Sequence, residues 1–209
     1  MKKLLSLVLA LLLALSFAGC SGSTAMTEAN VTATVDSAFD ALKRFDTKKL
    51  EKYVDSKTLS VIITYANKHD QFADLGKALF KNLEYSIESI DLNAKTVTVS
   101  VRNKDLKDTA SAFTKALVSK YSALQMLSLL NNETWLNTSL NSLTDSIAIA
   151  KMQSAPVSVT LTVTAGKKNL MLGFDDTAEN AVSGGALQAV KSLTSGLTGS
   201  KSTTESTSN

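Results

Sequence analysis

Residues 83–101, LEYSIESIDLNAKTVTVSV, mark the point where the apolar pattern of the chain changes from a helical period to a strand period. Apolar and polar residues alternate along this stretch, which predicts two strands that each have one buried face and one exposed face. The apolar positions are Leu83, Tyr85 and Ile87 in the first strand and Val97, Val99 and Val101 in the second. Between them, Asp91 to Ala94 predicts a turn in which Asn93 takes a positive φ, so the two strands form a hairpin.

A second pair of strands is expected near the end of the chain. Apolar residues alternate with Ser and Thr from Val157 to Val163, and a turn is predicted at Gly166-Lys167-Lys168 before a last strand that ends at Phe174. Pro156 is placed at the start of the third strand, where its missing N–H matters least. The four strands predict an antiparallel sheet with one apolar face and one polar face.

Helical periodicity surrounds these hairpins. Apolar residues recur at three- and four-residue steps, so we expect helices over 30–45, 46–54 (capped by Asp46), 56–82 and 175–182 (capped by Asp175). A longer helical insertion is expected between the hairpins, about residues 105–153, with a break at Asn131-Asn132. Gly184-Gly185 interrupts the last helix. The expected fold class is α+β.

The amino-terminal segment carries the layout of an export signal. Lys2 and Lys3 precede an apolar run from Leu4 to Leu15, and the segment ends in Phe17-Ala18-Gly19-Cys20. The run is too short for a spanning helix, which needs roughly 20 apolar residues. The segment resembles a bacterial lipoprotein signal with its lipobox. This resemblance implies that Cys20 is lipidated and that residues 1–19 are removed; a plain cleaved signal with a chance cysteine is the alternative.

These features predict the domain organisation and the location of the protein. We expect a flexible tether over 20–29, one α+β domain over 30–193 and a disordered Ser/Thr-rich tail over 194–209. The expected location is the outer face of a bacterial cell membrane, which the lipid on Cys20 would contact. Two of the 22 Lys and Arg residues lie in the leader, which leaves 20 against 19 Asp and Glu residues. No basic stretch with interleaved aromatics occurs, so a nucleic-acid partner is not expected.

The order of elements carries a second resemblance. Helices, a strand hairpin, a connection and a second hairpin follow one another over about residues 30–193, together with the local sequences FDTKKL at 45–50 and NAVSGGAL at 180–187. In this order the chain is similar to lipoproteins of unknown function with a nuclear transport factor 2-like or cystatin-like domain. The resemblance implies a curved four-stranded antiparallel sheet that wraps a helix, and a concave pocket.

Few residues suggest chemistry. One Cys and one His argue against a zinc site, and Asp175, Asp176 and Glu179 are better explained as a helix start than as a calcium site. Tyr65 and His69 share a helix face, but a solvated helix end explains them better than an acid–base pair. The candidates for a pocket wall are Tyr65, Tyr85 and Trp135. No cofactor, metal site or catalytic residue is predicted.

Two functional hypotheses remain open from the sequence. The first is a non-enzymatic lipoprotein domain that binds an unknown protein or a small apolar ligand. The second is a small-molecule carrier or an enzyme that uses the concave pocket of the fold. A carboxylate and a tyrosine within hydrogen-bond reach in a pocket would favour an enzyme.

Overall fold

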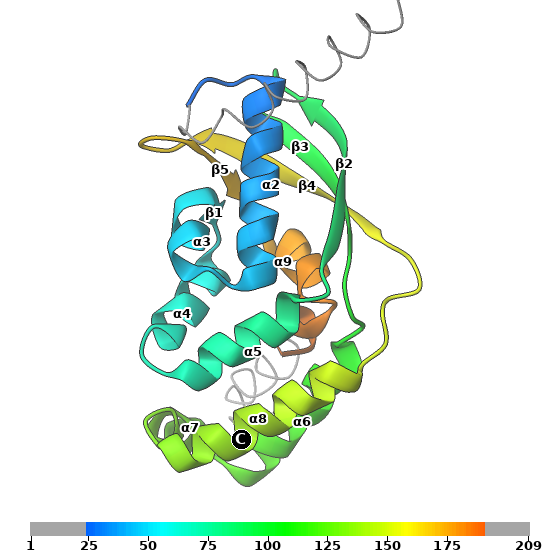
Figure 1. Cartoon of the computed structure of the whole chain (residues 1–209). Helices are drawn as coiled ribbons and strands as arrows, with labels where there is room; N and C mark the ends of the chain where they lie inside the picture. Colours follow the sequence, from blue (N-terminus) through cyan, green and yellow to red (C-terminus); the bar gives the residue numbers. More distant parts are fainter. Residues whose placement is uncertain (1–23, 191–209) are drawn as a thin grey trace, which may run out of the picture.

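The computed structural model describes residues 24–190, which form helices around one side of an open sheet (Figure 1). The elements in chain order are α2 (Glu28–Arg44), α3 (Thr47–Tyr53), β1 (Val54–Asp55), α4 (Lys57–Ala66), α5 (Asp70–Phe80), β2 (Glu84–Asp91), β3 (Thr96–Arg102), α6 (Lys107–Lys120), α7 (Ala123–Leu129), α8 (Glu133–Ile149), β4 (Val157–Ala165), β5 (Leu170–Gly173) and α9 (Asp176–Val182). The α+β class predicted from the sequence is confirmed.

The sheet has five strands and is mixed, so the prediction of four antiparallel strands was incomplete. Its strand order is β1-β5-β4-β3-β2. The pairs β2–β3, β3–β4 and β4–β5 are antiparallel, whereas β1 pairs parallel to β5, with Val54 opposite Leu172. Two residues are too few to show a period of two, and Val54 directly follows a helical pattern. This edge strand therefore has no signal in the sequence.

The two faces of the sheet differ as the alternation predicted. Val97, Val99 and Val101 of β3 are fully buried, and Leu161 of β4 lies opposite Val97 on the same face. The other face carries hydroxyl side chains, such as Thr98 and Thr160, whose oxygens lie 3.3 Å apart. Helix α2 supplies much of the buried layer against the apolar face, and Figure 1 shows it lying across the strands. Burial of these aliphatic side chains stabilises the fold.

The predicted helix over 56–82 is in fact two helices. Asn67 closes α4 and His69 is the N-cap residue of α5, so the chain turns between them. The predicted insertion contains the break at Asn131-Asn132, where the Asn132 side chain accepts a hydrogen bond from the Trp135 N–H at 3.0 Å. It contains a further break before α7, where Ser122 and Gln125 form a capping box. Asp46 and Asp175 cap α3 and α9 as predicted.

The first hairpin turn differs in one detail from the prediction. Lys95, and not Asn93, has the positive φ of 55°. Asp91 Oδ1 accepts hydrogen bonds from the N–H groups of both Asn93 and Ala94, at 2.9 and 2.8 Å. This Asx-type turn leaves Lys95 to make the left-handed step into β3. The second turn lies where predicted, closed by a 2.8 Å bond from Gly166 N–H to Asn169 O.

A buried asparagine joins the sheet to the inserted helices. The Asn103 amide nitrogen donates to the Leu79 carbonyl at 2.9 Å and to the Val182 carbonyl at 2.7 Å, and its own Oδ1 accepts from the Lys104 N–H at 2.8 Å. Its side chain therefore links the ends of α5 and α9 to the start of the insertion. In Figure 1 the insertion, α6 to α8, forms the end of the molecule away from the sheet.

Candidate functional site

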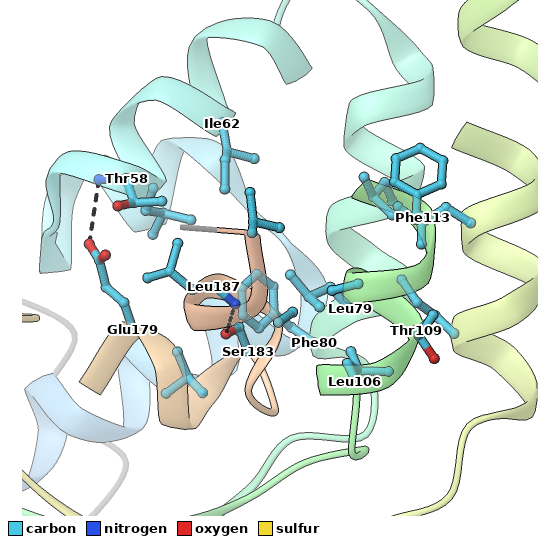
Figure 2. A pocket seen from close by; sticks show the side chains of 18 of the residues that line it. Thr58, Ile62, Leu79, Phe80, Leu106, Thr109, Phe113, Glu179, Ser183 and Leu187 are labelled. Atoms are coloured by element: carbon cyan, nitrogen blue, oxygen red, sulfur yellow. Dashed lines mark hydrogen bonds between the residues drawn. The ribbon is translucent and has the colours of Figure 1, made fainter. Parts of the chain in front are cut away.

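A cleft with a volume of about 490 Å³ lies between the inserted helices and the rest of the domain. Its walls come mainly from α4, α5, α6 and α9 and from the helical turn at 186–190, with one residue of α7 and two of α8. Figure 2 shows the apolar side chains of Ile62, Leu79, Phe113 and Leu187 around this space. The insertion therefore forms one wall of the cleft.

The α6 wall arises from helical spacing. Ala110, Phe113, Thr114 and Leu117 occupy positions i, i+3, i+4 and i+7 of the helix, so they share the face that lines the cleft. The Thr114 hydroxyl donates to the Ala110 carbonyl at 2.8 Å within the helix. The Thr114 hydroxyl proton is therefore used within the helix, and apolar side chains make up most of this wall.

The opposite wall depends on the bend after α9. Gly184 and Gly185 have φ values of 61° and 84°, which turn the chain so that Leu187 and Val190 line the cleft. Ser183 bridges the bend, because its hydroxyl donates to the Asn180 carbonyl at 3.0 Å and accepts from the Leu187 N–H at 3.2 Å. The hydrogen bonds of the Ser183 hydroxyl are therefore made to backbone groups on either side of the bend.

One end of the cleft is polar. Glu179 of α9 accepts hydrogen bonds on Oε1 from the Ser56 hydroxyl and, at 3.4 Å, from the Thr58 N–H. Ser56 is the N-cap of α4, and its own oxygen accepts from the Leu59 N–H at 3.0 Å. The Glu179 carboxylate therefore faces the amino-terminal end of α4, where the helix dipole favours a negative charge. In Figure 2 this end lies across the cleft from Phe113.

The cleft offers little for acid–base or metal chemistry. Among residues 24–190, its wall carries one carboxylate, Glu179, and no His, Cys, Lys, Arg or Tyr side chain. The same part of the chain contains no group of three or more His, Cys, Asp or Glu residues placed to hold a metal ion. Two acidic residues at the start of α9 have different contacts: Asp175 caps α9, and Glu179 accepts a hydrogen bond from Ser56 at the start of α4.

A second, smaller hollow of about 300 Å³ lies between α4 and α7. Tyr65 and His69 both line it, in agreement with their shared helix face. His69 Nδ1 lies 2.9 Å from Glu133 Oε1, and Gln71 donates to Glu133 Oε2 at 2.9 Å. The hydrogen bonds from His69 and then Gln71 lower the pKa of the Glu133 carboxyl. These contacts join Glu133 at the start of α8 to His69 and Gln71 at the start of α5.

The structure separates the three residues predicted for a pocket wall. Tyr65 lines the smaller hollow, while Tyr85 and Trp135 contribute to neither hollow. The Tyr85 ring stacks on Phe39 with centroids 4.4 Å apart, and Trp135 packs edge-on against Tyr121 at 6.1 Å. Cys20 lies outside the described residues. Sequence reasoning missed Glu179 as a cleft residue, because only the packing of α9 on α4 brings it there.

Comparison of the chain with family models, with curated proteins and with solved structures gave no match. Within residues 24–190, no helix combines the length and apolar character needed to cross a bilayer.

Proposed function

We propose that this protein is a membrane-anchored lipoprotein of the bacterial cell envelope whose domain binds a small apolar molecule in the cleft. The observation that supports binding is the cleft itself. Its volume of about 490 Å³ lies within the range of small-molecule sites, roughly 300–1,000 Å³. Within residues 24–190, its wall is built mainly from aliphatic and aromatic side chains, with a single charged group at one end.

A binding role is favoured over catalysis by the composition of the wall. Among residues 24–190, the wall offers Glu179 as its one titratable side chain, with no second group to act as the complementary acid or base. Glu179 has Ser56 and the Thr58 N–H as partners, and both serve the start of α4. The tyrosine and carboxylate pair that would favour an enzyme occurs instead as Tyr85 and Asp36, outside the cleft.

The anchoring part of the proposal is supported by the leader and by Cys20. Lipid chains on a single cysteine would hold the domain at the membrane surface, because each buried methylene adds about 0.8 kcal/mol of membrane affinity. Mass spectrometry of the native amino-terminal peptide tests this, with a diacylglyceryl group on Cys20 expected. Cys20→Ser is expected to move the protein out of the membrane fraction. An unmodified thiol in the native protein would contradict the anchoring.

Ligand binding is tested with N-phenyl-1-naphthylamine, a neutral dye whose emission rises in apolar sites. We expect saturable binding by the mature chain carrying Cys20→Ser, so that no acyl chain is present. Ala110→Phe on α6 and Ala186→Phe on the opposite wall each add a ring to the cleft and should abolish this binding. Ala116→Phe, at an exposed position of the same helix α6, is the matched control. Equal dye binding by all variants would contradict a site in the cleft.

A further inference from the structure

The only charged side chain on the described wall of the cleft is a carboxylate whose two oxygens differ in their surroundings. Both hydrogen bonds to Glu179, from the Ser56 hydroxyl and the Thr58 N–H, end on Oε1. Oε2 has no hydrogen-bond partner among residues 24–190. An ionised carboxylate accepts on both oxygens, with about four lone-pair sites in total. Glu179 therefore retains accepting capacity at the end of an apolar space.

No cation within the described residues neutralises this carboxylate. The ion pairs found in residues 24–190 join other groups, such as Arg102 with Glu84 and Lys77 with Asp74. No Lys, Arg or His side chain from any element lines the cleft in this part of the chain. The positive charge that Glu179 meets is the partial charge at the start of α4. A half-buried carboxylate beside apolar walls gains most from a donor that also carries a positive charge.

We propose that the cleft selects cationic amphiphiles, that is, molecules with an apolar body and a protonated amine. This inference rests on the proposed function, because it names the ligand class of the same site. The ammonium group donates to Glu179 Oε2, and the apolar body lies along the α6 wall toward Phe113. A fatty acid whose chain is as long as that of the amine is disfavoured, because its carboxylate would face Glu179 and like charges repel.

The test compares three ligands with one eight-carbon chain and different head groups: octylamine, octan-1-ol and octanoate. Each displaces N-phenyl-1-naphthylamine from the mature chain carrying Cys20→Ser, at about pH 7, where the amine is charged. We expect octylamine to displace the dye at about tenfold lower concentration than octanol, because a hydrogen bond to a charged group is stronger than a neutral one. Octanoate should be the weakest of the three.

Glu179→Gln supplies the decisive comparison. The glutamine keeps an oxygen for Ser56 and Thr58 but removes the charge. The preference for octylamine over octanol should therefore fall to about one- to twofold, with each displacement corrected for the dye affinity of that variant. Glu51→Gln on α3 makes the same change of net charge at an exposed position away from the cleft, and should keep the full preference. Circular dichroism and thermal unfolding check that both variants fold.

The outcomes separate this inference from the proposed function. Dye binding that is lost in Ala110→Phe, together with equal displacement by amine and alcohol, leaves an apolar site and overturns the amine selectivity. A preference that persists in Glu179→Gln, or octanoate binding as tightly as octylamine, also overturns it. If the dye does not bind, octylamine binding is measured directly by equilibrium dialysis. Binding that Glu179→Gln abolishes supports the inference. An absence of binding, or binding that persists in Glu179→Gln, overturns it.

Discussion

The Ser56 hydroxyl donates a hydrogen bond to the Glu179 carboxylate across 123 positions of sequence. The contact joins the start of α4 to α9, and the same Ser56 oxygen accepts from the Leu59 N–H at 3.0 Å. Ser56 is therefore both a helix cap and a link between two walls of the cleft. Its surroundings explain why a small polar residue is buried at this position, where only 4% of its surface is exposed.

Ser56→Ala should lower the free energy of unfolding by about 1–2 kcal/mol, because the N-cap of α4 and the contact with Glu179 are both lost. Urea denaturation followed by circular dichroism measures this change. Ser60→Ala is the control: Ser60 is exposed on the same helix, and its loss should cost less than about 0.5 kcal/mol. Equal effects of the two substitutions would show that the cap does not stabilise the domain.

Asn103→Ala should be strongly destabilising. The Asn103 side chain is fully buried, and its amide satisfies the carbonyls of Leu79 and Val182. Leaving such buried groups unpaired costs about 1–3 kcal/mol each, so we expect a total loss of about 2–4 kcal/mol. Asn93→Ala, at an exposed turn position, should change stability by less than about 0.5 kcal/mol. A loss below about 1 kcal/mol for Asn103→Ala would contradict this linking role of the side chain.

Gly184→Ala should destabilise the bend that follows α9. The φ of Gly184 is 61°, and a Cβ there would lie 1.8 Å from the Lys104 carbonyl oxygen. Gly185 has a similar left-handed backbone, but a Cβ there would meet the Lys107 Cβ at 3.3 Å. Both substitutions strain the backbone, and the clash with a fixed carbonyl adds to the loss at Gly184 alone. The melting temperature of Gly184→Ala should therefore be lower than that of Gly185→Ala. The reverse order would contradict a clash at Gly184.

Tyr85 should make the domain sensitive to alkaline pH. Burial, and then the hydrogen bond that its hydroxyl donates to Asp36 Oδ1 at 2.9 Å, raise the pKa of Tyr85 well above its usual value. The folded state therefore keeps the Tyr85 proton at a pH where the unfolded chain loses it. This contribution to stability is fully present below about pH 10 and is lost as the pH rises further.

Tyr85→Phe keeps the ring that stacks on Phe39 and removes the ionising hydroxyl. The variant should lose less stability than the native protein between pH 9 and pH 11, values that bracket the ordinary tyrosine pKa of about 10. Denaturation in urea at several pH values measures this slope. An identical slope in both proteins would mean that Tyr85 ionises in the folded state as it does in the unfolded chain.

Much of the local structure is visible in the amino-acid sequence alone. Period-two alternation located β2, β3, β4 and β5, because side chains of a strand alternate between its faces regardless of its partners. Asp46 and Asp175 marked the starts of α3 and α9, since a side-chain oxygen satisfies an N–H only three residues away. Interactions of this kind depend on neighbours along the chain, so their signals are visible in the chain itself.

The edge strand β1, the break in the helix over 56–82 and the cleft became visible in the three-dimensional structure alone. The parallel pairing of Val54 with Leu172, the link from Ser56 to Glu179 and the bridge at Asn103 each join segments distant in sequence. Glu179 has the sequence signature of an ordinary first-turn acidic residue, and its place at the end of an apolar cleft follows from the packing of α9 against α4. Side-chain packing between distant elements leaves no periodic trace, because it depends on the three-dimensional path of the whole chain.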